Sequence, residues 1–257
     1  MSCWRRFTKS SIVLLLGHER KPRTIWWGLA AGYRICVSPR ENLGYLFGVA
    51  DIPLQRAIRE YVSHGDTVYD IGANIGYVSL LLAKQVGSQG QVFAFEPVPQ
   101  IFELLQRNVE LNTLGNITTL SVAASNESGE AAIRVPVSSS MSSLVWHRND
   151  PSAIELRIKT TAIDELIKAG DLPLPAFVKI DVEGAEGLVL EGMRNTIANR
   201  KPVLFLECSD IGRQTTWPLL RNLGYQCQLA STRKRVDTFD EYRHSDFLWL
   251  PRHSDGN

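Results

Sequence analysis

Two carboxylates and a glycine turn follow one another between residues 70 and 96. Asp70 ends a short apolar segment, and Gly72 and Gly76 then frame a five-residue turn. Glu96 ends a second apolar segment, 24 residues beyond Gly72. In open α/β sheets the carboxyl ends of parallel strands meet at one edge, where ligands bind. We therefore expect Asp70, the turn and Glu96 to form one binding site.

The charge beside this turn indicates which ligand it holds. A dinucleotide-binding turn reads Gly-x-Gly-x-x-Gly, but Asn74 occupies the place of the middle glycine. At ~4 Å and an effective dielectric of ~20, Asp70 would repel each pyrophosphate charge by about 4 kcal/mol. The same carboxylate attracts the sulfonium and ammonium of S-adenosylmethionine. Gly72 allows close backbone approach, amides near Gly76 can meet the ligand carboxylate, and Glu96 can accept both ribose hydroxyls.

A second group of charged residues follows a later apolar segment. Lys179 and Asp181 alternate with apolar residues and should share one face of a strand. A lysine in a buried parallel strand is costly unless it is paired, and Asp181, Glu183 and Glu207 are its candidate partners. Glu186 is expected in the first turn of the next helix, where a carboxylate also favours the helix dipole.

These acids allow two interpretations. In the first, Asp181, Glu183 or Glu186 takes the proton from a substrate hydroxyl, and a positioned base typically contributes ~10² to 10⁴-fold. In the second, Lys179 and the acids form a structural ion-pair cluster. A shared divalent metal would suit such acids, but the spacing provides no third ligand, so no metal site is predicted.

The pattern around these residues alternates between strands and helices. Apolar runs predict strands at 67–70, 91–96, 117–123, 177–181, 203–207, 225–229 and 247–250. Helical periodicity predicts helices at 53–64, 77–86, from 99 onward, 163–168, 185–197 and 217–223. We expect an α/β fold with a mostly parallel sheet, helices on both faces and an antiparallel edge formed by the last two strands. Extended segments 131–137 and 156–160 are expected to pair around a polar loop, 138–151, where His147 could serve the acceptor.

At these motifs the sequence resembles the FkbM family of S-adenosylmethionine-dependent methyltransferases. The matching segments are 70–76, 95–97, 123–129 and 179–186, within a resemblance over about residues 45–251. The resemblance implies a Rossmann-like class I methyltransferase sheet of seven strands with a reversed final strand. It also implies methyl transfer to oxygen, and contact with adenine at the end of the third strand. The expected cofactor-binding residues are Asp70, Gly72, Ala73, Asn74, Gly76, Glu96, Pro97, Val122 and Ala123.

The predicted function is S-adenosylmethionine-dependent O-methylation of a hydroxyl on a sugar, glycoside or small natural product. Methylation of a nucleic-acid base or amine, and non-catalytic cofactor binding, are the alternatives. An Asn/Asp-Pro-Pro-Tyr type turn, which would hold a planar amino group, does not follow the strand at 177–181. The acids there would also repel phosphates, so nucleic acid is not an expected partner.

Composition places the chain among ordinary globular proteins. It has 257 residues, 44% hydrophobic and 21% charged, and its net charge of +1 gives no general attraction to nucleic acid. The four cysteines form no C-x-x-C pair and fit a reducing compartment, so we expect a cytoplasmic protein. The apolar run 11–17 is too short to span a bilayer, and no cleavage site follows it.

Residues 1–50 are expected to form an N-terminal arm that packs on a methyltransferase domain at 51–257. Up to Arg40 the arm has eight basic residues and one acid, Glu19. Such an arm can contact a membrane or an anionic partner, although a solvated face is the interpretation we favour. Trp26 and Trp27 are expected to anchor the arm on the main body.

Overall fold

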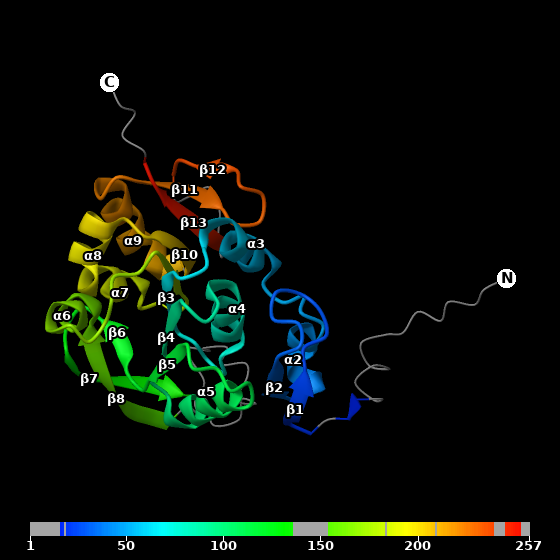
Figure 1. The fold of residues 1–257 in the computed structure, drawn as a ribbon. Coiled ribbons are helices and arrows are strands. Elements are labelled where there is room, and N and C mark those ends of the chain that lie inside the picture. The colour runs from blue at the N-terminus through cyan, green and yellow to red at the C-terminus, as the bar shows by residue number, and fades with distance from the viewer. Residues whose placement is uncertain are drawn as a thin grey trace.

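The computed structural model describes residues 16–17, 19–135, 154–182, 184–208, 210–238 and 245–252. The strands of its main sheet are β3 (Thr67–Ile71), β4 (Gln91–Phe95), β5 (Ile117–Leu120), β9 (Phe177–Ile180), β10 (Val203–Cys208), β11 (Tyr225–Leu229), β12 (Arg235–Val236) and β13 (Ser245–Pro251). Their order is β12-β11-β13-β10-β9-β3-β4-β5 (Figure 1). The five strands from β10 to β5 run parallel, whereas β13 is antiparallel to β10 and β11.

This topology confirms the mostly parallel α/β sheet and its antiparallel edge. One detail differs from the expectation, because the sheet has eight strands rather than seven. The additional strand is β12, which pairs with β11 through Cys227 and Val236. Both side chains are buried, so the short strand extends the apolar core at the outer edge of the sheet.

Helices cover both faces of the sheet, as predicted (Figure 1). They are α3 (Ile52–Tyr61), α4 (Tyr77–Val86), α5 (Pro99–Glu110), α6 (Ile163–Ala169), α7 (Glu186–Gly192), α8 (Arg194–Arg200) and α9 (Asp210–Asn222). Successive strand residues point to opposite faces, and Val68 and Tyr69 of β3 accordingly lie in different hydrophobic clusters. The first cluster includes side chains from α3, α4 and α5, and the second includes side chains from α7, α8 and α9.

The predicted strand 117–123 is divided between two sheets. β5 ends at Leu120, and the chain then enters a separate sheet in which Ala123 pairs with Thr160. This smaller sheet has the order β6-β8-β7 and consists of β6 (Ala123–Ser125), β7 (Gly129–Val135) and β8 (Ile154–Ala162). The prediction of one continuous strand is therefore wrong, because β8 offers the last residues a different parallel partner.

The pairing expected between the two extended segments is confirmed where the structure describes them. β7 and β8 run antiparallel, with Ile133 opposite Leu156. The polar loop 138–151, including His147, lies outside the described residues. The smaller sheet packs beside the carboxyl edge of the main sheet, where the site was expected.

Two predicted helices have different bounds. The helix expected at 185–197 is interrupted at Met193, whose φ and ψ of −123° and 21° are not helical, and continues as α8. A side chain at Gly192 would overlap the Ser125 carbonyl oxygen, so α7 ends in close contact with β6. The last helix begins at Asp210 rather than at 217, and Pro218 lies inside it.

The N-terminal segment packs against the first hydrophobic cluster. It contains β1 (Lys21–Thr24), β2 (Arg34–Val37) and α2 (Pro39–Leu46), and β1 pairs antiparallel with β2. Ile25, Ile35 and Leu46 are buried in that cluster. Trp26 and Trp27 are instead 44% and 60% exposed. The expectation that they anchor the segment is therefore wrong, because smaller aliphatic side chains fill the interface.

Two asparagines spaced four residues apart, Asn108 and Asn112, connect β2 to the main body through hydrogen bonds. Asn108 Oδ1 accepts a hydrogen bond from the Cys36 amide at 2.6 Å, and Asn108 Nδ2 donates to the Ile75 carbonyl at 2.7 Å. Just after α5, Asn112 exchanges two hydrogen bonds with the backbone of Arg34. Asn108 thus connects the N-terminal segment to the turn after β3.

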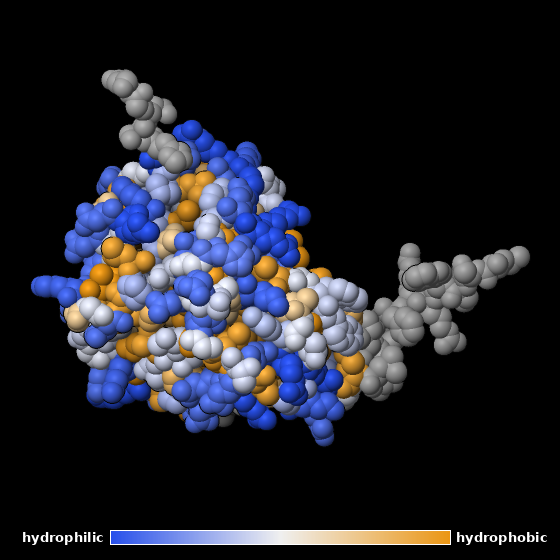
Figure 2. All heavy atoms as spheres, viewed as in Figure 1, coloured by the Kyte–Doolittle hydropathy of each residue, from blue (hydrophilic) through white to orange (hydrophobic). Residues whose placement is uncertain are grey.

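No helix in the described ranges is long and apolar enough to cross a membrane. Cys36, Cys208 and Cys227 are free and buried. Hydrophilic and hydrophobic side chains are interspersed on the visible face in Figure 2, and hydrophobic ones gather over α7 and the neighbouring small sheet. Leu188 of α7 is one of the exposed hydrophobic residues in this region.

Candidate active site

β3 leads directly into the predicted glycine turn. Gly72, Asn74 and Gly76 have φ angles of 77°, 50° and 88°, in the left-handed region that favours glycine. A Cβ on Gly72 would overlap the Asp181 carbonyl oxygen, so glycine is required where β3 and β9 end side by side. A Cβ on Gly76 would lie 2.6 Å from Cδ1 of Leu105 in α5. The turn is therefore shaped by close backbone and helix packing.

Glu96 is held beside this turn by two backbone amides. Its Oε2 accepts a hydrogen bond from the Asn74 amide at 3.0 Å, and its Oε1 accepts one from the Val98 amide at 2.9 Å. The side chain is buried, and burial raises the pKa of Glu96 to about 7 although both hydrogen bonds lower it. The carboxyl group thus links the turn to the end of β4.

Lys179 of β9 ties two acids to the same turn. Its Nζ lies 3.4 Å from Asp70 Oδ1 and 3.3 Å from Asp181 Oδ2, and it donates to the Gly72 carbonyl at 2.8 Å. Burial by itself lowers the pKa of the Lys179 ammonium, but Asp181 and Asp70 outweigh burial and raise it. The predicted partner Asp181 is confirmed, whereas Asp70 was not among the candidate partners.

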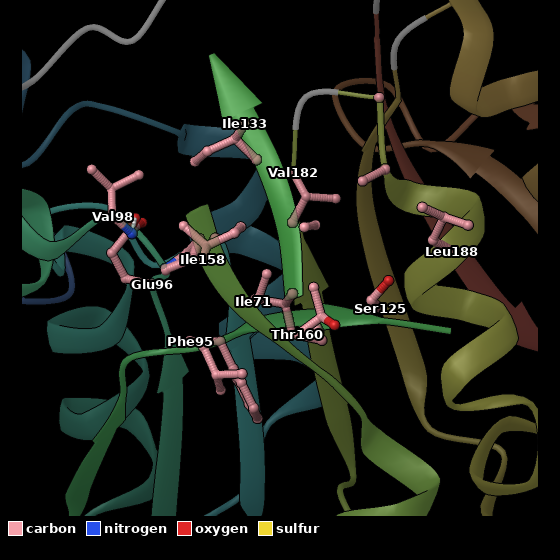
Figure 3. Close-up of a pocket in the computed structure, with 18 of the residues that line it drawn as sticks. Ile71, Phe95, Glu96, Val98, Ser125, Ile133, Ile158, Thr160, Val182 and Leu188 are labelled. Atoms are coloured by element: carbon pink, nitrogen blue, oxygen red, sulfur yellow. Dashed lines mark hydrogen bonds between the residues drawn. The ribbon is translucent and has the colours of Figure 1, made fainter. Parts of the chain in front are cut away.

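A cavity of about 560 Å³ lies between these residues and the smaller sheet (Figure 3). Small-molecule sites usually enclose roughly 300–1,000 Å³, so the cavity has the size of a cofactor site. Several predicted residues line it, namely Gly72, Asn74, Glu96, Pro97, Val122, Ala123 and Asp181. The predicted residues Asp70, Ala73, Gly76 and Glu186 are not among those that line it.

Asp70 is completely buried behind the cavity wall. Its Oδ2 accepts a hydrogen bond from Ser79 Oγ at 2.6 Å, and its Oδ1 faces Lys179. Its charge is therefore compensated within the protein. Glu96, Asp181 and Arg134 are the charged side chains among the described residues that line the cavity. Because the pKa of Glu96 is raised to about 7, selection of a positively charged ligand is expected to act mainly through Asp181.

The three predicted bases differ in position. Asp181 lines the cavity, and its side chain is 32% exposed. Glu186 is buried at the start of α7, where its Oε1 accepts a hydrogen bond from the Gly184 amide at 3.0 Å. Glu186 thereby stabilises the bend between β9 and α7. Glu183 lies outside the described residues.

An apolar wall that was not predicted from the sequence completes the cavity. Figure 3 shows Ile133 and Ile158, from β7 and β8, with Val182 and Leu188 around the cavity. The period-2 patterns of β7 and β8 predict strands, but they do not show which face meets another sheet. Pairing of β6 with β8 brings this wall to the site.

Two further acids influence the site electrostatically. Desolvation of its carboxylate raises the pKa of Asp51 although the residue is exposed, Lys179 lowers this pKa, and Asp181 raises it further. Burial, followed by Asp51 and Asp181, raises the pKa of Asp246 to about 6. Neither acid carries a sequence signal, because Asp51 precedes a helix and Asp246 lies near the start of β13, an inner antiparallel strand of the sheet. Within the described ranges, no three His, Cys, Asp or Glu side chains are placed to hold a metal ion.

The open α/β sheet, the glycine turn after its first strand and the acid after its second define a class I methyltransferase domain. The family model of the methyltransferase FkbM domain matches residues 70–227. Because the match covers more than half of the chain, the protein belongs to the FkbM methyltransferase family, whose cofactor is S-adenosylmethionine.

Curated proteins that are similar to this chain are methyltransferases as well. The hexuronic acid methyltransferase AglP of Haloferax volcanii is 32% identical over 143 residues, which are 55% of this chain and 56% of the relative. The methyltransferase sdnD of Sordaria araneosa is 28% identical over 155 residues, which are 49% of this chain and 60% of the relative. The matches thus span less than two thirds of the length of either relative.

Among solved structures, a methyltransferase FkbM from Methylobacillus flagellatus is similar to this chain. The sequence identity is 22% and the TM-score is 0.47, with 80% of this chain and 52% of that chain covered.

The residues around the cavity fit S-adenosylmethionine. Glu96 offers a carboxyl group, fixed by two amides, that can accept hydrogen bonds from ribose hydroxyls. Gly72 brings bare backbone to the cavity, and Val122 and Ala123 add small apolar side chains to its wall. Asp181 contributes negative charge to the cavity wall, which suits a positively charged sulfur.

Proposed function

We propose that the protein methylates a hydroxyl oxygen on a sugar, glycoside or small natural product. The observation that carries this proposal is the position of Asp181, a partly exposed carboxylate on the cavity wall at the end of β9. A base in this position suits an alcohol, which is a poor nucleophile until it loses its proton. The name of the Haloferax relative, which acts on a sugar acid, favours a sugar-like acceptor.

In the proposed mechanism, each residue has a separate task. S-adenosylmethionine, when bound, supplies a methyl group on a positively charged sulfur. Glu96 holds the ribose hydroxyls, while Val122 and Ala123 enclose the adenine. Asp181 takes the acceptor proton on the carboxylate oxygen that does not face Lys179. Alignment of the hydroxyl with the methyl group contributes further, up to ~7–11 kcal/mol in favourable cases.

Lys179 and Glu186 act as positioning residues in this proposal. Lys179 holds the Asp181 carboxylate and the Gly72 carbonyl together, so that base and turn keep one geometry. Glu186 fixes the bend that follows Asp181 through its hydrogen bond with the Gly184 amide. Glu183, which lies outside the described residues, stays a candidate base.

The acceptor and the compartment are further parts of the proposal. Asp181, as the proposed base, would repel a phosphate beside the acceptor hydroxyl, which argues against nucleic acid even though Arg134 also lines the cavity. Three free, buried cysteines are compatible with a reducing cytoplasm.

Substitution of the proposed base tests this function. Asp181→Asn keeps the size of the side chain but removes its basicity and its negative charge, so turnover should fall by roughly 10²-fold or more, and cofactor affinity should fall by a much smaller factor. Transfer of labelled methyl groups to a panel of sugars, glycosides and small hydroxylated compounds measures turnover, and calorimetry measures affinity. Asp171→Asn, at an exposed acid that does not line the cavity, is the matched control.

Three results would reject parts of this assignment. A fully active Asp181→Asn variant would remove Asp181 from the catalytic group. Methyl transfer to RNA or amines with none to hydroxyl compounds would reject O-methylation itself. Tight cofactor binding with no transfer to any acceptor would instead favour a non-catalytic module.

A further inference from the structure

The N-terminal segment presents two tryptophans at the protein surface. Trp26 and Trp27 are well exposed, and Val49 and Ile52, which follow α2, are 57% and 39% exposed. Contiguous exposed apolar side chains usually mark a surface that binds something. These side chains, together with two arginines of α3, form what we call the tryptophan face: Trp26, Trp27, Val49, Ile52, Arg56 and Arg59.

Ring contacts join the two parts of this face. The Trp26 and Phe47 ring centroids are 5.0 Å apart in an edge-on contact, and the Trp27 and Phe47 rings stack with centroids 5.6 Å apart. Gly48 has a φ of 64°, and a Cβ there would overlap the Trp27 carbonyl oxygen. The tryptophan loop and the residues after α2 are therefore in direct contact.

A buried glutamine fixes the same two loops. Gln55 Oε1 accepts a hydrogen bond from the Leu29 amide at 3.1 Å. Gln55 Nε2 donates to the Gly48 and Ala50 carbonyls at 2.9 and 2.8 Å. Because one buried side chain holds the backbone on both sides, the fold keeps the indoles at the surface.

Three exposed arginines accompany the apolar side chains, while the exposed Asp51 lies between Val49 and Ile52 in the sequence. Arg56 and Arg59 lie four and seven residues after Ile52, so the three share one face of α3, and both arginines are exposed. Arg34, opposite Thr24 at the base of the tryptophan loop, is exposed as well. Within the part of the chain that the structure describes, none of these three arginines forms an ion pair with an acid.

We propose that the tryptophan face binds the surface of an anionic lipid bilayer. Indole rings concentrate at membrane–water interfaces, where an apolar body and a polar N–H are both accommodated. Arginines beside them attract anionic headgroups. The combination of partly exposed indoles and exposed arginines therefore matches the headgroup region, and Figure 1 shows the segment from β1 to α2 at one side of the molecule. A solvated face, favoured from the charge pattern alone, leaves the exposed indoles unexplained.

Vesicle co-sedimentation of the full chain tests this proposal. Vesicles of phosphatidylcholine with one quarter phosphatidylglycerol should bind the protein at about 0.1 M salt, and pure phosphatidylcholine vesicles should bind it far less. Trp26→Ala/Trp27→Ala should reduce binding to the level of the pure phosphatidylcholine vesicles. Arg56→Gln/Arg59→Gln should weaken binding by roughly 30-fold, the factor that corresponds to two headgroup-facing cations.

Matched variants elsewhere on the surface serve as controls. Leu174→Ala removes another exposed apolar side chain, and Lys159→Gln/Lys168→Gln removes two exposed cations, so both should bind like the wild type. Circular dichroism and thermal unfolding establish that each variant is folded; the targeted side chains are exposed, so all should be.

Three outcomes would overturn the proposal. The wild type could fail to bind anionic vesicles, or the folded tryptophan variant could bind them as well as the wild type. In the third outcome, sedimentation velocity would show a wild-type dimer and a monomeric tryptophan variant, which would make this face a contact between two copies of the chain.

Discussion

Removal of the Lys179 ammonium is the most informative perturbation of the site. Lys179→Met keeps most of the length of the side chain but leaves the completely buried Asp70 carboxylate without its cation. Breaking a buried ion pair in this way typically costs about 3–5 kcal/mol. Asp181 contributes less to this cost, because water reaches its partly exposed carboxylate. We expect the free energy of unfolding at pH 7 to fall by about 3–5 kcal/mol.

Urea unfolding followed by circular dichroism measures this loss, provided that the slope with denaturant is unchanged. The double variant Asp70→Asn/Lys179→Met removes both charges, and the amide that replaces the Asp70 carboxylate can retain a hydrogen bond with Ser79. It should be more stable than Lys179→Met by roughly 1–3 kcal/mol. Lys168→Met, at an exposed lysine, should stay within about 0.5 kcal/mol of the wild type.

Two results would refute this reasoning. A Lys179→Met variant within about 1 kcal/mol of the wild type would mean that the buried carboxylate does not depend on this cation. A double variant no more stable than Lys179→Met would mean that the loss comes from packing or from the Gly72 carbonyl instead.

Two further predictions concern Glu96 and Asn108. Because the pKa of Glu96 is about 7 in the folded protein against an ordinary 4.5, the folded state holds a proton that the unfolded chain releases, and stability should fall as pH rises between these values. The free energy of unfolding of Glu96→Gln, relative to that of the wild type, should therefore increase between pH 4.5 and pH 7, by up to about 3 kcal/mol. The same relative value at both pH values would contradict this. Asn108→Ala should cost roughly 1–3 kcal/mol for the unpaired Cys36 amide and weaken cofactor binding through Ile75. The neighbouring variant Asn112→Ala, which has no bond to the turn, should leave cofactor affinity unchanged, and equal losses in both variants would disprove a specific link to the turn.

The parts of the site that were predictable have local causes. Asp70, Gly72 and Glu96 lie at strand ends that apolar runs identify, so their common edge follows from the parallel sheet. Lys179 and Asp181 alternate along one strand, and their pairing follows from the cost of a buried unpaired lysine. In each case the prediction needs only the apolar run of a strand and the residues within or directly after it.

The parts that were missed depend on contacts between distant segments. Asp70 is compensated by Lys179, which is far away in the sequence, so its burial behind the cavity wall has no local signature. The chain leaves the main sheet after Leu120 because β8 offers the next residues a different strand to pair with. The exposure of Trp26 depends on how Gln55 fixes two loops, whereas hydrophobicity by itself predicts burial.

Calorimetric titration with two cofactors tests the central claim most directly, that the cavity beside Glu96 and Asp181 holds S-adenosylmethionine. The wild type should bind S-adenosylmethionine and should not bind NAD, and Glu96→Ala should weaken S-adenosylmethionine binding. Binding of NAD with no binding of S-adenosylmethionine would contradict the assignment of the turn, the acids and the cavity to a methyl donor.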